Sequence, residues 1–127
     1  AIRFGPIGEL SFADWSFTIR NELDIVFLVT RAAWPHLVAA GGGSIVNVAS
    51  ITASRGAFLM PQNAHGAAKG GVLALTYQLV VEGGPHGIRV NAVSPAMTET
   101  PQTAPLLHDW RVKVTTAPAT GSRVTAL

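Results

Sequence analysis

Cysteine is absent from the sequence, and this absence excludes two kinds of protein. Without thiols the chain has neither a disulfide framework nor a cysteine-based metal site. The histidines do not replace them, because none has the spacing usual for metal ligands: His36, His65, His86 and His108. We therefore predict no metal site.

Charge is also scarce, since 13% of the 127 residues are charged and 48% are hydrophobic. The net charge of +2 is scattered, whereas a nucleic-acid surface needs clustered Lys and Arg. Apolar runs fall far short of the ~20 residues that a membrane span requires, and no secretory signal stands at the start. These absences favour a cytoplasmic protein without nucleic-acid or membrane partners. The apolar composition suits an α/β fold whose sheet is covered on both faces, or a subunit that buries surface against a partner.

The first regular element that the sequence predicts is a long helix over residues 14–40. Apolar side chains recur there at intervals of three and four, which is the period of one helix face. Asp14, or Ser11 before it, is a suitable N-cap. Pro35 is expected to kink the helix or weaken its hydrogen bonding, and the glycines at 41–43 end it.

Two short strands and a second helix follow. The β-branched run at 44–50 is typical of a buried strand, and so is the run at 88–93. Residues 65–82 between them are predicted to form a helix that contains three glycines. Each of these costs about 1 kcal/mol relative to alanine, which implies close packing against a neighbour. Residues 115–127 show no clear pattern and are predicted to be an irregular tail.

The order helix, strand, helix, strand places the chain in the α/β class. A crossover helix between two strands implies parallel pairing in a right-handed unit. Two strands are few for an open parallel sheet, so we expect further strands before Ala1. Residues 1–127 are accordingly interpreted as a single, partial domain.

Polar groups that could carry chemistry follow both strands. In open parallel sheets, ligands bind beyond the carboxyl ends of the strands. Ser50 follows the first strand, and residues 94–100 follow the second. His65 and Lys69 lie one helical turn apart, so both face the same way. A hydroxyl, an imidazole and an ammonium group are therefore expected to converge on one edge of the sheet.

Three segments of the chain resemble the short-chain dehydrogenases/reductases. They are GGSIVNVAS at 42–50, KGGV at 69–72 and HGIRVNAVSP at 86–95. In that family a strand ends on a catalytic serine, a Tyr-x-x-x-Lys motif opens the next helix, and an Arg-Val-Asn strand leads to a Pro-Gly turn. The resemblance implies a partial Rossmann-like, doubly wound parallel sheet whose N-terminal half is missing from this chain.

The resemblance also implies a role for each matching residue. Ser50 would hydrogen-bond the oxygen of the substrate, and Lys69 would bind the nicotinamide ribose. His65 would be the third catalytic residue. The loop after the second strand would contact the nicotinamide side of the cofactor through four residues: Pro95, Ala96, Thr98 and Thr100.

His65 is the main departure from the family pattern, because it stands where the family has its catalytic tyrosine. Imidazole exchanges protons near neutral pH, so it is a chemically reasonable substitute. The only tyrosine, Tyr77, lies three helical turns further on and cannot replace it. The family often has an asparagine in the preceding helix. If this sequence is aligned with the family without a gap, Glu22 stands at the position of that asparagine. Asn21 is the residue directly before it.

A second departure concerns the dinucleotide loop. The family's Thr-Gly-x-x-x-Gly-x-Gly turn brings backbone N–H groups to the pyrophosphate, and no such turn occurs in this sequence. The glycines at 41–43 follow a helix and precede a strand, which is the reverse of the required order. The cofactor implied is NAD or NADP in the full-length parent, with weak or no binding expected for this chain alone.

Two functions remain in competition. The favoured one is an NAD(P)-dependent oxidoreductase that transfers hydride between the cofactor and a small-molecule alcohol or ketone, in the full-length parent. The alternative is a catalytically inactive fragment or pseudoenzyme that still forms a homo-oligomer. This dimer or tetramer would assemble through helices 14–40 and 65–82. A Ser50–His65 hydrolase is disfavoured because the sequence lacks a Gly-x-Ser-x-Gly motif. The resemblance selects neither a substrate nor one of the two cofactors.

Overall fold

The structure is a computed structural model and describes residues 3–56, 60–96, 98, 101 and 104. The tail predicted at 115–127 lies outside the described residues, as does Thr100. The chain divides into two compact units, Ala1–Ala96 and Met97–Leu127. All helices and strands named below belong to the first unit.

The long helix predicted at 14–40 is interrupted by one wider turn. Its three parts are α1 (Phe12–Ile19), the π-helical turn η1 (Arg20–Asp24) and α2 (Ile25–Ala39). The helix begins earlier than predicted because Ser11 is the N-cap, and its hydroxyl accepts the N–H of Asp14 at 3.1 Å. Pro35 lies inside α2 without ending it. The periodicity had given no sign of η1.

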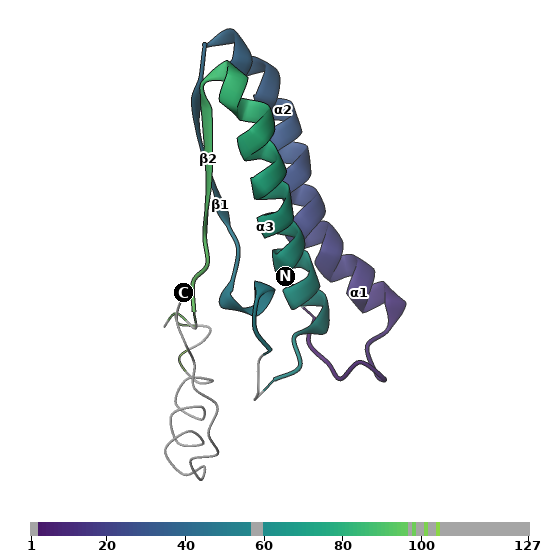
Figure 1. The fold of residues 1–127 in the computed structure, drawn as a ribbon. Coiled ribbons are helices and arrows are strands. Elements are labelled where there is room, and N and C mark those ends of the chain that lie inside the picture. Colours follow the sequence, from purple (N-terminus) through teal and green to yellow (C-terminus); the bar gives the residue numbers. More distant parts are fainter. Residues whose placement is uncertain (1–2, 57–59, 97, 99–100, 102–103, 105–127) are drawn as a thin grey trace. The chain divides into compact units, whose positions relative to one another are not determined.

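The two strands form a parallel sheet, as predicted. Their bounds are β1 (Gly43–Val48) and β2 (Ile88–Val93), and they pair in register from Gly43↔Ile88 to Val48↔Val93 (Figure 1). The second strand has the predicted bounds. The first ends at Val48, so Ser50 lies just beyond the strand rather than at its last position.

The crossover between the strands is α3 (Asn63–Gly83), which begins two residues before the predicted range. A short 3-10 turn, η3 (Gly84–His86), and Gly87 in a left-handed conformation then lead into β2. The core lies between α3 and the sheet. Its buried members are Leu79, Ile88 and Val90, with Trp34, Leu37, Ile45 and Leu75 packed around them.

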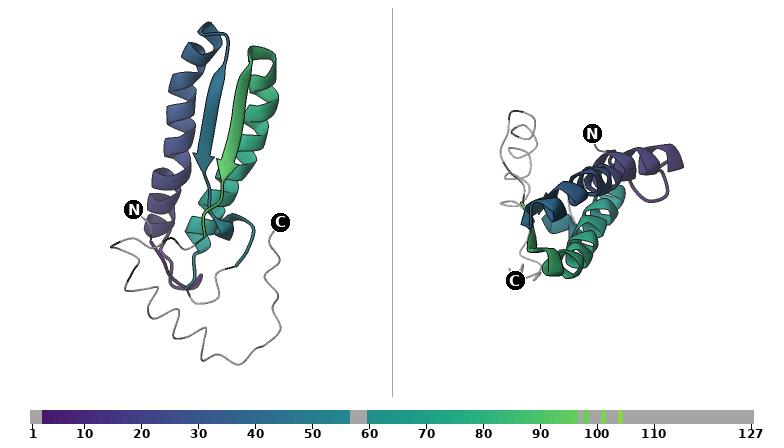
Figure 2. Two further views of the ribbon diagram at one scale, coloured as in Figure 1. Left: turned by 90° about the vertical axis from the view of Figure 1, so that its left-hand side faces the viewer. Right: turned by 90° about the horizontal axis from the view of Figure 1, so that it is seen from above.

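Both long helices cover the same face of the sheet (Figures 1 and 2). The side chains of Val46, Val48 and Val93 point to the opposite face and are 47 to 58% exposed. The apolar composition had suited a sheet covered on both faces. Of the described residues, only those of the helices cover it, and they cover one face.

A buried polar bond ties β1 to α3 within this otherwise apolar interface. The side-chain amide of Asn47 donates to the hydroxyl of Thr76 at 2.9 Å, and that hydroxyl donates to the carbonyl of Val72 at 2.8 Å. Both polar side chains are buried, at 6% and 5% exposure. Because a buried amide without a partner is costly, this bond fixes which part of α3 faces the carboxyl-terminal half of β1.

Glycines form the turn at the amino ends of the strands. Gly41 has φ +74° and Gly42 has φ +143°, values that L side chains rarely adopt. A Cβ at Gly42 would also lie 2.7 Å from the carbonyl oxygen of Gly87. The glycines at 41–43 therefore close the junction of α2 with β1, at the end of the sheet opposite Ser50.

Candidate active site

The carboxyl ends of β1 and β2 are joined beyond the last paired residues. The N–H of Ala49 donates to the carbonyl of Val93 at 2.8 Å, and the N–H of Ile51 donates to the carbonyl of Pro95 at 3.2 Å. Ser50 lies between these two bonds. The pairing therefore brings Ser50 and Pro95 to the same edge, as expected for residues that follow parallel strands.

Ser50 caps the 3-10 turn η2 (Ile51–Ala53) that follows it. Its Oγ accepts the N–H of Thr52 at 3.3 Å and the hydroxyl proton of Thr52 at 2.9 Å. Among the described residues, no group accepts the hydroxyl proton of Ser50. Its oxygen is thus held in place, and its proton is available to a ligand.

Lys69 reaches the same edge from α3. Its Nζ donates to the carbonyl of Val48 at 3.0 Å, two residues before Ser50. The odd-numbered residues along β1, such as Gly43, and Ala49 beyond it, turn their backbone groups toward β2 and its flanking residues and bond to them. The carbonyls of the even-numbered residues, including Val48, therefore point away from β2. The ammonium group of Lys69 therefore lies at the carboxyl end of β1, on the side of the strand away from β2.

His65 contacts a carboxylate that the sequence analysis had not placed among the site residues. Its Nδ1 lies 2.6 Å from Oε2 of Glu22, and the two side chains are only 12% and 10% exposed. The ring of Phe4 meets the imidazole edge-on at 6.4 Å between centroids. His65 is thus enclosed by residues from η1 and from the N-terminal segment.

A glycine allows η1 to approach α3 closely enough for this contact. A Cβ on Gly71 would lie 2.7 Å from Cδ2 of Leu23. With only hydrogen at that position, Leu23 packs directly on the helix and carries its neighbour Glu22 toward His65. Gly71 thus packs closely against a neighbouring element, as the free-energy cost of glycine in a helix had implied.

The N-terminal segment is fixed to the start of α3 by backbone bonds. The N–H of Gly5 donates to the carbonyl of Pro61 at 3.4 Å, and the side chain of Asn63 donates to the carbonyl of Gly5 at 3.0 Å. Phe4 precedes Gly5, so these bonds hold its ring beside His65.

The structure therefore separates the predicted site residues into two groups. Ser50, Lys69 and Pro95 gather at one edge of the sheet, while His65 bonds to Glu22. Among the described residues no hydrogen bond joins His65 to Ser50. Ala96 and Thr98 follow β2 and are exposed, and Thr100 lies outside the described residues.

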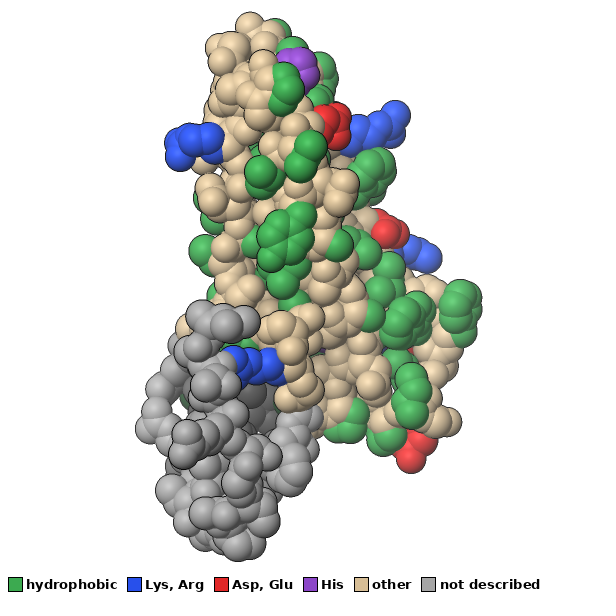
Figure 3. Space-filling model, in the orientation of Figure 1, with side chains coloured by type: hydrophobic (Ala, Val, Ile, Leu, Met, Phe, Trp, Pro, Cys, Tyr) green, Lys and Arg blue, Asp and Glu red, His purple; other side chains and the backbone are tan. Residues whose placement is uncertain are grey.

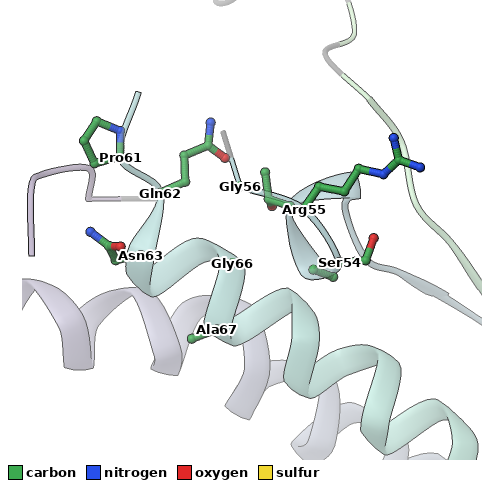
Figure 4. Close-up of a pocket in the computed structure, with 10 residues that line it drawn as sticks. Ser54, Arg55, Gly56, Pro61, Gln62, Asn63, Gly66 and Ala67 are labelled. Carbon is green, nitrogen blue, oxygen red and sulfur yellow. The ribbon is translucent and has the colours of Figure 1, made fainter. Parts of the chain in front are cut away.

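Two hollows border these residues. One of about 520 Å³ lies between the segment after η2 and the start of α3, with Ser54 and Arg55 on one side and Gln62 and Gly66 on the other (Figure 4). The other, of about 440 Å³, lies between α2 and β1 and is lined by both Glu22 and Lys69.

The chain as a whole is similar to known proteins. A family model described as enoyl-(acyl carrier protein) reductase matches residues 1–125. Acetoacetyl-CoA reductase of Allochromatium vinosum is 37% identical over 103 residues, which are 81% of this chain and 41% of that protein. A protein of Burkholderia xenovorans described as a short-chain dehydrogenase/reductase has a TM-score of 0.81 at 30% identity, over 89% of this chain and 44% of its own. Gluconate 5-dehydrogenase of Burkholderia cenocepacia J2315, solved with NADP and tartrate, has a TM-score of 0.78 at 30% identity, over 88% and 45%.

The chain belongs to the short-chain dehydrogenase/reductase family. The predicted fold class, a partial Rossmann-like parallel sheet, is confirmed by the structure and by these neighbours. The chain spans 41 to 45% of the length of these three relatives.

The packing of α3 on η2 predicts that alanine will have different effects on stability at two glycines of the helix. A Cβ on Gly66 would lie 3.1 Å from the backbone carbonyl oxygen of Thr52, whereas a Cβ on Gly70 would lie 3.7 Å from that of Ala53. Gly70→Ala is expected to stabilise the protein by up to about 1 kcal/mol through helix propensity. Gly66→Ala is expected to be less stable than Gly70→Ala by about 1 kcal/mol or more, because the carbonyl must move. Urea unfolding of both variants measures the difference, and equal stabilities would contradict this packing.

Proposed function

We propose that the complete protein is an NAD(P)-dependent oxidoreductase that transfers hydride between the cofactor and an alcohol or carbonyl substrate. The placement of Ser50 and Lys69 at one edge of the sheet supports this proposal most directly. Hydrogen bonds to the backbone of the strand ends hold both residues there. Lys69 donates to the carbonyl of Val48, and Ile51, the neighbour of Ser50, donates to the carbonyl of Pro95. The matching relatives, a reductase and a dehydrogenase among them, agree with this chemistry.

In this proposal each side chain has one task. Ser50 donates its hydroxyl proton in a hydrogen bond to the substrate oxygen and thereby orients the carbonyl. His65 gives a proton to that oxygen during reduction and takes one during oxidation. Lys69 offers its ammonium group to ribose hydroxyls. These tasks are placement and proton transfer, and the hydride itself comes from or goes to a bound nicotinamide.

Among the described residues, Lys69 and Pro95 are placed where they could contact the nicotinamide end of a dinucleotide. Lys69 is a donor whose partner in the structure is a backbone carbonyl, and Pro95 brings the segment after β2 beside Ser50. Ala96, Thr98 and Thr100 continue that segment. The glycines at 41–43 lie at the other end of the strands, so we expect the pyrophosphate contacts to come from residues outside this chain. On the same grounds we keep the expectation of weak or no NAD(P) binding by residues 1–127 alone.

The second candidate is a pseudoenzyme that keeps a helix-mediated interface. One observation favours it: large apolar side chains are exposed along both long helices, and Figure 3 shows them gathered over this face. They include Phe27, Leu28 and Val29 on α2, and Tyr77, Val80 and Val81 on α3. We propose that a second copy of the protein covers this face, and such an interface is compatible with either candidate.

Location is proposed on separate grounds. Among the described residues, no helix combines the length and the apolarity needed to cross a membrane. The cytoplasmic location that the sequence favours stays a prediction.

Replacement of Ser50 tests the proposed reaction. Ser50→Ala in the complete protein is expected to lower kcat for ketone reduction about a hundredfold, because the substrate oxygen loses a donor. NADPH and NADH oxidation with acetoacetyl-CoA and a panel of further ketones measures it. Ser54→Ala is the matched control, because the exposed Ser54 hydroxyl only bonds to the carbonyl of Ile51. No oxidation with any ketone by the wild-type protein would favour the pseudoenzyme.

A charge placed on the exposed helix face tests the interface. Val81 is 77% exposed on α3, and Ile7, outside the helices, is 75% exposed. Val81→Arg is expected to dissociate the oligomer, because burial of an unpaired charge is costly, while Ile7→Arg leaves it intact. Sedimentation equilibrium gives the mass of each variant. A monomeric wild-type protein, or an oligomer that both variants leave intact, would contradict the proposed interface.

A further inference from the structure

The contact between Glu22 and His65 joins two elements that are distant in sequence. The two residues are 43 positions apart, and their side chains are almost completely buried where η1 packs on α3. At 2.6 Å, the carboxylate oxygen of Glu22 accepts a hydrogen bond from Nδ1–H of the ring. This carboxylate has no counterpart in the serine, tyrosine and lysine set that the resemblance implies.

The other ring nitrogen of His65 is accessible. Among the described residues, every buried side-chain nitrogen and oxygen atom has a hydrogen-bond partner. Within the part of the chain that the structure describes, His65 makes one polar contact, through Nδ1, and Nε2 has no partner. Nε2 is therefore not sealed inside the fold, although the ring as a whole is 12% exposed. The imidazole is held at one nitrogen and open to a ligand at the other.

We propose that Glu22 is a positioning residue that holds His65 in place as the proton donor and acceptor of the site. This inference rests on the proposed dehydrogenase function. The bond to Glu22 keeps a proton on Nδ1, so that Nε2 is the nitrogen that exchanges a proton with substrate. The negative charge of Glu22 also stabilises the imidazolium that exists before proton donation.

For reduction, a bound reduced nicotinamide would supply the hydride, with its two electrons, that the carbonyl carbon gains. The carbonyl oxygen gains the proton of His65 Nε2, so that an N–H bond breaks and an O–H bond forms. The ring becomes neutral, and its remaining proton stays on Nδ1, which still donates a hydrogen bond to Glu22. Oxidation of the alcohol reverses both transfers.

The local backbone supports a special role for Glu22. It lies in the π-helical turn Arg20–Asp24, and such turns inside α-helices are rare and are frequent at functional sites. The preceding Asn21 turns its amide back to the carbonyl of Phe17 at 2.7 Å. Asn21 is thereby occupied within its own helix, whereas the side chain of Glu22 makes a polar contact with α3.

Other charged groups near His65 already have partners or lie on solvent-facing segments. Lys69, one turn further along α3, donates to a backbone carbonyl, and Arg3, beside Phe4, pairs with Asp14 at 3.6 Å. Arg55 lines the hollow at the start of α3. Of the charged side chains on the elements packed against His65, only that of Glu22 bonds to the ring.

Glu22→Gln in the complete protein separates charge from hydrogen bonding, because the amide oxygen still accepts from Nδ1–H. We expect kcat for ketone reduction to fall about tenfold while KM for NADPH changes less than about twofold. Glu22→Asp, which restores the charge, should return kcat toward that of the wild type.

The ring itself gives a second readout that needs no turnover. Nitrogen NMR of the histidine side chains is expected to show His65 protonated on Nδ1 in the neutral wild-type protein, and to lose this preference in Glu22→Ala. Asp24→Asn is the matched control, because Asp24 is an exposed acid on the same turn. It should change neither the NMR signals of His65 nor kcat.

The outcomes distinguish this inference from the proposed function. An active wild-type protein in which Glu22→Gln behaves like Asp24→Asn would overturn the role of Glu22 and leave the oxidoreductase proposal standing. Neutral His65 with its proton on Nε2 would overturn it as well. A wild-type protein without any NAD(P)-linked turnover would overturn the proposed function, and with it the proton transfer assigned to this pair. Lower thermal stability of Glu22→Gln with unchanged kcat would show a purely structural contact and overturn the positioning role.

Discussion

Parallel pairing of β1 with β2 is the constraint on which the candidate site depends. The register from Gly43↔Ile88 to Val48↔Val93 places both carboxyl ends at one edge of the sheet. Parallel strands need a crossover, and α3 supplies it, beginning near the edge that β1 has just left. Ser50 and Pro95 therefore meet after the strands, and Lys69 reaches the same edge from the helix. A different register would disperse these groups, although each would keep its place in the sequence.

The sequence predicted the elements because their signals are local. Apolar periodicity marked both helices, and β-branched runs bounded by glycine and polar residues marked both strands, with β2 observed at its predicted bounds. The π-helical turn was missed because one wider turn hardly disturbs a pattern of threes and fours. The predicted first strand was two residues too long at its end, because it included Ala49 and Ser50, whereas β1 ends at Val48.

The partner of His65 could not be derived from spacing. Glu22 and His65 are 43 residues apart, and their contact depends on how closely η1 packs against α3. That approach depends in turn on the missing side chain at Gly71, beneath Leu23. The sequence offered a single hint, which was that Glu22 falls on the position of a family asparagine. It could show that the tyrosine is replaced, but not that the replacement brings a buried carboxylate with it.

The apolar composition is explained only in part by the core. Valines on the outer face of the sheet and large side chains on α2 and α3 remain exposed. They leave room for groups that cover these faces.

The central claim is that His65, held by Glu22, acts beside Ser50. A crystal structure of the complete protein with NADP and an unreactive ketone analogue would test it most directly. The account predicts that Nε2 of His65 and Oγ of Ser50 both lie about 3 Å from the ketone oxygen, with Nδ1 still bonded to Glu22. A ketone oxygen that contacts Ser50 while Nε2 faces bulk solvent would contradict it.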